Sequence, residues 1–306
     1  MAQAPTPVKL TEPPLPEPRY SYGGDEFLFC ELDVAMSFRA NFKALAICRE
    51  LEQRALPGIV EIAQANASYV IRYDPDDIAP QRLLAELQEI HEHADPEALS
   101  FRTRVFDIPA FYNDPWTHEI LIRFRERHQE PTSTDIQYAT HINGYKSVDE
   151  FIAAHSGSPW FVSMVGFVAG LPFLFQLVER ARQIEVPKYL RPRTDTPKLT
   201  IGHGGCFGCI YSVRGAGGYQ MLGITPAPIF DPAQGLPYFK DFMCLFRPGD
   251  IIKFKAIDRE SYDGALKQVE TGTFNLRIRP VAFAMKKFLD DPVGYNHQLE
   301  EVLYGN

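Results

Sequence analysis

The sequence predicts an α+β fold of two domains, and three observations support that prediction. Residues 25–111 alternate short apolar strands with amphipathic helical segments. After residue 112 a few short helices are followed, up to Ala256, by short strand-like runs that glycine and proline interrupt. The length of 306 residues allows two ordinary domains. The second pattern is typical of a β-barrel or a β-sandwich.

The first domain is expected at residues 20–111. A strand at Asp25–Leu32, a helix, strands at Gly58–Ile62 and Tyr69–Tyr73, a second helix and a strand at Val105–Phe111 follow one another. The apolar side chains that define the faces of these elements are Phe38, Phe42, Leu45 and Cys48, then Tyr69, Ile71 and Tyr73, then Leu83, Leu87 and Ile90. The order β-α-β-β-α-β is that of a ferredoxin-like split βαβ unit, which by itself decides no function.

The remaining segments complete the domain plan. Residues 1–19 are rich in proline and polar residues, which predicts a flexible or polyproline-like arm. Residues 112–306 form the second domain. Its helices are expected at Thr117–Gln129, Thr134–His141 and Val148–His155, and its C-terminal part as a strand at Phe274–Ile278 and then helices to Leu303.

Composition excludes several classes of protein. The formal net charge of −8 argues against a nucleic-acid partner, which requires a basic face. No uninterrupted apolar stretch approaches about 18 residues, so no membrane span is expected, and the N-terminus lacks the pattern of a secretory signal. An odd count of five cysteines gives no disulfide framework and suits the reducing cytoplasm, where we expect the protein.

Three blocks of sequence then point to a family. They begin at Tyr20 ("YSYGGDEFLFCELDVAMSFRANF"), His155 ("HSGSPWFVSMVGFVAGLPFL") and Arg191 ("RPRTDTPKLTIGHGGCFGCIYSVRGAGGYQMLGITPAPIFDP"). In this order they resemble the family of allophanate hydrolase subunit 1 and the 5-oxoprolinase B subunit, the first half of a carboxyltransferase. The segments "HINGYKSVDEF" and "GTFNLRIRPVAFAMKKFLDD" resemble urea carboxylase in particular. The resemblance implies a ferredoxin-like domain and a cyclophilin-like β-barrel with a C-terminal helical extension.

The chain departs from the family pattern at three positions. Val168 stands where urea carboxylases carry an acidic residue that is implicated in holding urea. Ala169 and Ala216 replace prolines of two glycine-rich loops. Because valine cannot accept hydrogen bonds from the amino groups of urea, the departure at Val168 favours the lactamase branch and an acceptor other than urea.

The resemblance implies a carboxyltransferase subunit that acts on a small urea-, amide- or lactam-like acceptor and is inactive alone. Its expected partners are a subunit 2 of the allophanate hydrolase type, a biotin carboxylase and a biotin carrier. Another polypeptide would carry the biotin, because no biotinyl-lysine context is present. The resemblance also implies that the complex uses ATP, and since no P-loop motif is present, this chain would hold no nucleotide by a P-loop. Two alternatives stay open: the B subunit of an ATP-dependent 5-oxoprolinase, and a regulatory protein that inhibits a histidine kinase.

Glycine-rich turns are the first candidates for the site. Such turns let a ligand approach main-chain N–H groups, which can stabilise an oxyanion, although each turn is equally explained as a tight barrel turn. The candidate substrate-binding residues in and beside the turns are Gly166, Phe167, Gly170, Gly204, Gly205, Tyr211, Gly217, Gly218 and Tyr219. The two tyrosines have the alternative of being core residues.

Polar side chains supply the remaining candidates. His155 is a candidate acid/base or anion contact, or else a histidine at a helix C-terminus. Arg191, with Arg193 as its neighbour in "RPR", is the candidate arginine for a carboxylate or phosphate, against the alternative of a surface ion pair. Asn143 could bind an amide substrate, but Asn-Gly is also a turn dipeptide. "HGGCFGC" lacks a second pair of ligands at zinc spacing, so no metal site is expected.

Overall fold

The structure is a computed structural model that describes residues 9–305. Within this range the chain forms two compact units, one from residues 9–102 and 282–292 and one from residues 103–281 and 293–305. The division therefore falls at residue 102, not at residue 111, and a short C-terminal segment returns to the first unit. No described helix is both long and apolar enough to span a bilayer.

The predicted N-terminal arm is described only in part, since residues 1–8 lie outside the described residues. Residues 9–18 form no helix or strand. In the first unit the N–H of Leu10 donates to the carbonyl of Leu289 at 2.8 Å, and Lys9 pairs with Asp290 at 3.3 Å. The described part of the arm therefore has fixed contacts within its own unit.

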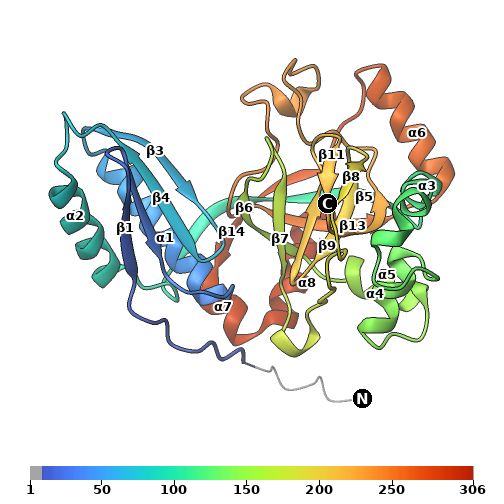
Figure 1. The fold of residues 1–306 in the computed structure, drawn as a ribbon, viewed down its shortest axis with the longest axis horizontal. Helices are drawn as coiled ribbons and strands as arrows, with labels where there is room; N and C mark the ends of the chain where they lie inside the picture. The colour runs from blue at the N-terminus through green and yellow to red at the C-terminus, as the bar shows by residue number, and fades with distance from the viewer. Residues whose placement is uncertain (1–8, 306) are drawn as a thin grey trace. The chain divides into compact units, whose positions relative to one another are not determined.

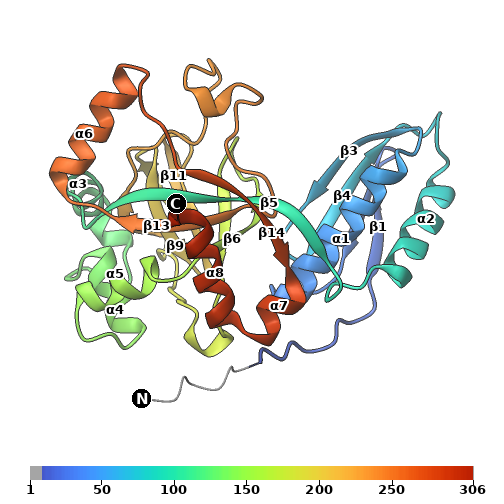
Figure 2. The same ribbon diagram turned by 180° about the vertical axis from the view of Figure 1, so that it is seen from behind.

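The first unit is a four-stranded antiparallel sheet with two helices on one face (Figures 1 and 2). Its elements are β1 (Arg19–Gly23), β2 (Phe27–Glu31), α1 (Phe38–Arg54), β3 (Ile59–Gln64), β4 (Ser68–Tyr73), α2 (Pro80–His93) and, from the end of the chain, α7 (Met285–Asp290). The strands are ordered β1-β2-β4-β3. Ser37 caps α1 by accepting from the N–H of Ala40, and Pro80 occupies the first turn of α2, where no N–H is needed.

The core of the first unit confirms the predicted periodicities. Tyr69, Ile71 and Tyr73 of β4 point to one face and are at most 1 % exposed. The predicted apolar positions of both helices are buried as well, namely Phe38, Phe42, Leu45, Cys48, Leu83, Leu87 and Ile90. Alternation in the strand and spacings of three and four in the helices therefore identified the buried faces correctly.

One strand was assigned to the wrong sheet. Val105–Phe111 lies in β5 (Ser100–Tyr112), but β5 pairs with β13 and β12 in the second unit. The edge of the first sheet that this strand was expected to occupy is taken by β1, which pairs antiparallel with β2. The reason lies in the side chains of β5, because Phe106 and Ile108 are buried in the core of the second unit.

The second unit is built on a closed ring of strands. Its elements are β5, α3 (Pro115–Phe124), η1 (Arg125–Arg127), α4 (Asp135–Ile142), α5 (Val148–Ser156), β6 (Trp160–Val165), β7 (Pro172–Gln176), η2 (Arg180–Arg182), β8 (Arg193–Thr196), β9 (Thr200–Gly204), β10 (Phe207–Ile210), β11 (Gly215–Gly217), β12 (Gln220–Ile224), η3 (Pro237–Phe239), β13 (Ile251–Ala256), α6 (Arg259–Glu270), β14 (Ile278–Ala284) and α8 (Pro292–Tyr304). Strands pair in the order β12-β9-β10-β7-β6-β13-β5, and β12 pairs with β5 to close the ring. β8 and β11 form a separate two-stranded ribbon.

A glycine permits this closure. A Cβ on Gly223 of β12 would lie 2.5 Å from the carbonyl oxygen of Phe111, so only glycine lets β12 approach β5 here. The three predicted helices are present as α3, α4 and α5, which lie together on one side of the ring (Figure 1). Each begins at a polar cap, namely Asp114, Thr134 and Ser147.

The C-terminal part differs from the prediction in two respects. The strand expected at Phe274–Ile278 begins only at Ile278, as β14, although Phe274 and Leu276 are buried in alternation as a strand pattern requires. These two side chains reach the core from a segment that is not itself a strand, although the carbonyl of Arg277 accepts a hydrogen bond from the N–H of Asp107 in β5 at 3.0 Å. Helix α6, which follows Asp258 as its cap, was not predicted, whereas the helical extension is present as α7 and α8.

Candidate active site

A pocket of about 410 Å³ in the second unit gathers several of the predicted residues. It is lined by Phe167, Leu171, Phe173, Lys188, Pro192, Cys209, Tyr211, Ala216, Gly217, Gly218 and Tyr219. The lining comes from the loop before β7, the segment before β8, and strands β10 and β11 with their flanking loops. Its surface is mainly apolar and includes four aromatic side chains, and it contains one lysine and no carboxylate.

Two tyrosines form much of the wall, and glycines give them room. A Cβ on Gly217 would lie 2.4 Å from the Tyr211 hydroxyl, and a Cβ on Gly204 would lie 2.4 Å from the Tyr219 ring. Such distances are far below van der Waals contact, so a side chain at either glycine would displace a tyrosine. Gly204 therefore supports the pocket from behind Tyr219, whereas Gly217 and Gly218 line it directly.

Phe167 lies at the exposed side of the pocket. It is 69 % exposed and has a φ of 69°, a left-handed conformation that a bulky residue rarely adopts. The loop around it is held by the N–H of Gly166, which donates to the carbonyl of Leu171 at 3.1 Å, and by the positive φ of Gly170. Gly166 and Gly170 thus hold the loop that presents Phe167, but they do not line the pocket themselves.

Two positively charged side chains, Lys188 and Arg193, lie at or next to one wall of the pocket. Lys188 lines the pocket with its ammonium 5.1 Å from the centroid of the Tyr219 ring. Arg193, next to the lining residue Pro192, is 0 % exposed. Its guanidinium stacks 4.3 Å from the Tyr189 ring centroid and donates through Nη2 to Thr196 Oγ1 at 3.3 Å, but Nε and Nη1 have no hydrogen-bond partner.

Asp135 is the nearest buried carboxylate in this region, and its oxygens are occupied. Oδ1 accepts from the Tyr189 hydroxyl and Oδ2 from the N–H of Met221, both at 2.6 Å. Burial raises the pKa of Asp135, while the charge of Arg193 lowers it. No carboxylate of residues 9–305 lies within ion-pair distance of Arg193, so its charge is balanced only at longer range.

The tyrosine hydroxyls and the cysteine thiol of the pocket are neutral at physiological pH. Burial raises the pKa of the Tyr211 hydroxyl, although the nearby Arg193 lowers it in part. Burial also raises the pKa of Tyr219, and it raises that of the Cys209 thiol to about 12. These groups can donate hydrogen bonds but cannot serve as a base or a thiolate nucleophile. The pocket can therefore bind and polarise a ligand, and a proton acceptor must come from the ligand or from another chain.

His155 lies in the core of the second unit rather than at the pocket. It is fully buried in the last turn of α5. Its Nδ1 lies 2.8 Å from the Tyr112 hydroxyl, and the centroid of its ring lies 4.7 Å from that of Trp160. Burial, followed by the charge of His203, lowers its pKa well below the usual value. A neutral ring enclosed by aromatic side chains has no route to a substrate, so its interpretation as a catalytic residue is not supported by this geometry.

Three other candidates lie apart from the pocket. Arg191 is exposed and does not line it, so of the two arginines in "RPR" the buried Arg193 is the one placed against its wall. Gly205 exchanges two backbone hydrogen bonds with Val186, which leaves its N–H unavailable to a ligand. Asn143 ends α4, where its side chain donates to the carbonyls of Ala139 and Glu185 and accepts from the N–H of Glu185.

The "HGGCFGC" segment is divided between core and wall. His203 is buried, its Nε2 lies 2.9 Å from the carbonyl of Ile184, and burial lowers its pKa to about 4. Cys209 lines the pocket and Cys206 lies half-buried elsewhere. Among residues 9–305 no group of three or more histidine, cysteine or acidic side chains is placed to hold a metal ion.

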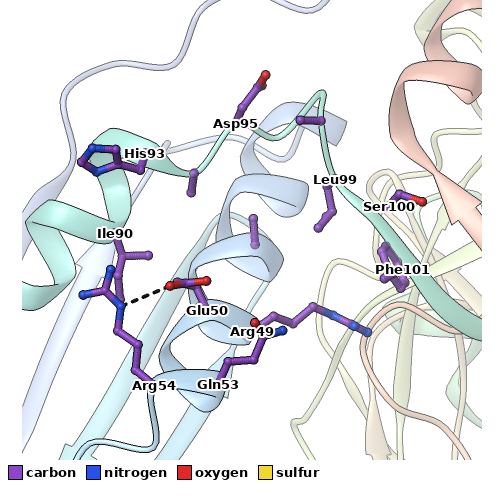
Figure 3. A pocket seen from close by; sticks show the side chains of 13 residues that line it. Arg49, Glu50, Gln53, Arg54, Ile90, His93, Asp95, Leu99, Ser100 and Phe101 are labelled. Atoms are coloured by element: carbon purple, nitrogen blue, oxygen red, sulfur yellow. Dashed lines mark hydrogen bonds and ion pairs between the residues drawn. The ribbon is translucent and has the colours of Figure 1, made fainter.

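Two further pockets have similar volumes but less suitable linings. One of about 400 Å³ in the first unit is lined by Arg49, Glu50, Arg54, His93 and Phe101 among others (Figure 3). Its Arg54 is already engaged by Glu50, Glu86 and Glu89, so its charges pair with one another. Another of about 440 Å³ is lined by Asn143 and the end of α5 and holds no buried unpaired charge.

Sequence reasoning missed part of the site. Lys188 and Phe173 line the pocket but were not among the candidates. Phe173 lies in the block that begins at His155, whereas Lys188 lies in none of the three blocks. Arg191 was preferred to Arg193 in "RPR", and only the fold shows that Arg193 is buried at the start of β8 whereas Arg191 is exposed. No sequence signal distinguished the two arginines, and none existed for Lys188.

With this geometry in hand, comparison with known proteins identifies the family. Residues 18–239 match the family model described as the carboxyltransferase domain, subdomain C and D. The chain therefore belongs to this carboxyltransferase family, and the resemblance to allophanate hydrolase subunit 1 and the 5-oxoprolinase B subunit is confirmed.

Individual relatives fall into two groups. The urea amidolyase of Lachancea kluyveri is 25 % identical over 283 residues, which cover 90 % of this chain and 15 % of that protein. The 5-oxoprolinase B subunit of Bacillus subtilis (strain 168) is 25 % identical over 248 residues, which cover 78 % of this chain and 92 % of that protein. The chain thus spans only a small part of the first relative and most of the second.

The fold has a counterpart among solved structures. The Kluyveromyces lactis urea carboxylase superposes with a TM-score of 0.78 at 21 % identity, over 99 % of this chain and 27 % of that one. A second structure, that of the protein TTHA0988, gives a TM-score of 0.57 at 24 % identity, over 76 % of this chain and 40 % of that one. The mixed α/β fold with several sheets is thus shared with the corresponding part of a urea carboxylase.

Proposed function

We propose that this chain is one half of a carboxyltransferase that transfers a carboxyl group from carboxybiotin to a small amide- or lactam-like acceptor. The observation that carries the proposal is the aromatic pocket between Phe167, Tyr211 and Tyr219 on a chain of the carboxyltransferase family. In the complex the chain would act with a subunit 2 partner, a biotin carboxylase and a biotin carrier. It would be inactive alone, and the five free cysteines suit a cytoplasmic location.

The pocket residues fit such a ligand. A ureido ring is flat and largely apolar on its faces, which matches Tyr211, Tyr219 and Phe173, and its oxygens require the donors that Tyr211 and Lys188 carry. Carboxybiotin would supply the carboxyl group when bound. The residues of this chain would bind, exclude water from the aromatic wall and keep the Tyr211 proton in place as a hydrogen-bond donor.

The acceptor is proposed to be something other than urea. Val168 is half-buried and packs against the cluster of Leu171, Cys209, Tyr211 and Tyr219. An apolar contact at this position gives the amino groups of urea no acceptor beside the pocket. The complex would use ATP, and this sequence contains no P-loop motif to hold it.

A second candidate is the B subunit of an ATP-dependent 5-oxoprolinase. It is favoured by Val168 and by the 92 % coverage of the Bacillus subtilis 5-oxoprolinase B subunit, against 15 % of the Lachancea kluyveri urea amidolyase. A lactam ring would occupy the same aromatic pocket. The two candidates differ in whether a biotinylated carrier is needed.

We also propose that the two units correspond to a ferredoxin-like domain and a cyclophilin-like β-barrel. The first is supported by the split βαβ arrangement, in which β4 lies between β2 and β3. The second is supported by the closed ring that β12 and β5 complete. A solved crystal structure of the chain, compared with both fold types, tests this assignment.

The functional test is an ATPase assay of the chain co-purified with a subunit 2 homologue from the same genome. Urea, guanidine, small amides and 5-oxoproline are supplied, with and without a biotinylated carrier and its carboxylase. Turnover that requires the carrier supports carboxyl transfer and identifies the acceptor. Turnover on 5-oxoproline without the carrier overturns it in favour of the lactamase, and no stimulation by any acceptor contradicts both candidates.

A further inference from the structure

We infer that the aromatic pocket is selective for a compact planar ligand that carries one negative charge, and that the buried Arg193 sets this selectivity. The inference rests on the proposed function for the identity of the site and goes further by naming the charge of its ligand. The class of ligand is a carboxylate or a carboxylated nitrogen attached to a flat ring.

The first argument is the free-energy cost of burying the Arg193 guanidinium. A fully buried guanidinium is costly unless its charge and its donors are satisfied. Here one nitrogen donates to Thr196, the face stacks on Tyr189, and Nε and Nη1 remain without partners. The neighbouring Asp195 is bound by Arg123 and Arg214, so it does not compensate Arg193.

The second argument is where this charge acts. Arg193 lies close enough to Tyr211 and Cys209, two lining residues, to lower the pKa of each against the larger effect of burial. The guanidinium therefore lies close to the Tyr211 side chain. A charge held in a buried environment projects a stronger field than one in water, because little solvent screens it.

The third argument is the sign of the other charges at the pocket. Lys188 adds a second positive charge beside the Tyr219 ring, and no lining residue is acidic. The formal net charge of the protein is −8, so its overall charge repels anions and only the local cations of the pocket favour an anionic ligand. Two local cations beside flat aromatic walls match a planar monoanion.

Tyr211 connects the buried charge to the ligand. Its phenol stays protonated, because burial raises its pKa, and its hydroxyl lies beside Gly217 at the pocket. Arg193 thus acts as a positioning residue that polarises this hydroxyl toward an anionic oxygen, while Tyr211 and Lys188 make the contact. The chain alone suffices for this binding, without ATP, biotin or a partner.

Benzoate and benzamide test the inference, since they have nearly the same shape and differ in charge. Binding to the full chain is measured by saturation-transfer NMR and calorimetry, and the amide signals of Gly217 and Gly218 locate the ligand. We expect benzoate to bind at least tenfold more tightly than benzamide. Equal affinities, binding of neither probe, or benzoate binding that leaves both glycine signals unchanged would overturn the inference.

Variants assign the preference to its residues. Arg193→Met and Lys188→Met are each expected to reduce the benzoate preference by about tenfold or more, while Lys198→Met, on the exposed surface, retains it. Tyr211→Phe removes only the hydroxyl that Arg193 is inferred to polarise. It therefore tests the same role if Arg193→Met does not fold. A preference that survives in Lys188→Met and Tyr211→Phe, or that is lost in Arg191→Met instead, would contradict the role of Arg193.

These measurements separate the inference from the proposed function. Anion-selective binding without carrier-dependent turnover would leave the inference intact and overturn carboxyl transfer. Carrier-dependent turnover by a complex whose pocket binds benzoate and benzamide equally would support carboxyl transfer and overturn the inference.

Discussion

The hydroxyl of Tyr211 occupies the space that a side chain on Gly217 would need, since a Cβ there would lie 2.4 Å from the oxygen. The two residues belong to different segments, with Gly217 at the end of β11 and Tyr211 just after β10. Their contact brings the β8–β11 ribbon against the wall of the strand ring. The position of the hydroxyl at the pocket therefore depends on the absence of a methyl group at residue 217.

Gly217→Ala is expected to displace Tyr211 and to weaken benzoate binding by about tenfold. Overpacking of this kind also lowers the free energy of unfolding by about 1–3 kcal/mol. Gly215→Ala is the matched control, because a Cβ at Gly215 would meet nothing within 4 Å. Urea denaturation and calorimetry on both variants check the prediction, and equal behaviour of the two alanines would refute it.

Phe167→Ala is expected to weaken ligand binding about threefold to tenfold, the range that one aromatic contact provides. Stability should change by less than about 0.5 kcal/mol, since the side chain is 69 % exposed and its removal leaves no cavity. Phe242→Ala, at another exposed phenylalanine, serves as the control in both measurements. A large loss of stability in Phe167→Ala would show that the side chain has a structural role instead.

His203→Gln is expected to reduce the pH dependence of stability between pH 6.5 and pH 4. Burial lowers the pKa of His203 from 6.5 to about 4, so in this window the unfolded chain binds the additional proton. The free energy of unfolding of the native protein should therefore fall as the pH falls, by up to about 3 kcal/mol from this residue.

The glutamine can still donate to the carbonyl of Ile184 but cannot titrate. Urea denaturation at pH 7.0, 5.5 and 4.5 gives the slope, and His141→Gln, on the exposed side of α4, is the control. The lowered pKa of His155 contributes a slope of the same sign, which remains in the variant. An unchanged slope in His203→Gln would show that His203 takes up its proton at the same pH in the folded and the unfolded protein.

Asn143→Ala is expected to lower the free energy of unfolding by about 1 kcal/mol, because its side chain joins the end of α4 to the backbone of Glu185. Binding of benzoate should be unchanged, since Asn143 does not line the aromatic pocket. Asn275→Ala, at an exposed asparagine, is the control. Loss of binding with native stability would restore Asn143 as a substrate-binding residue.

Local patterns were enough to predict most of the first unit. Tyr69, Ile71 and Tyr73 alternate with polar neighbours, and Leu83, Leu87 and Ile90 follow helical spacing, so each buried face could be derived from side chains a few residues apart. The sheet membership of β5 could not be derived in this way. Strand pairing is decided by contacts between distant segments, and only the fold shows that residues 19–23 take the edge of the first sheet while residues 100–112 join the second.

The candidate site was predictable to a similar extent. Glycine-rich turns identified Gly217 and Gly218 and, through the flanking aromatics, Phe167, Tyr211 and Tyr219. The two interpretations of His155, a substrate contact or a histidine at a helix C-terminus, could not be separated, because a histidine in the last turn of a helix has the same local signal whether it faces solvent or core. Lys188 has no signal at all, since its proximity to Tyr219 arises only when the chain folds.

The placement of β1 has a consequence for the order of events during synthesis. Because β1 precedes β2, the whole four-stranded sheet lies within residues 19–73 and can form while the rest of the chain is still being made. The core of that unit is finished much later, since Phe38 and Phe42 pack against Phe288 and Phe283. A nascent chain would therefore leave these two phenylalanines without those aromatic contacts until residues 283–288 have been synthesised and have left the ribosome.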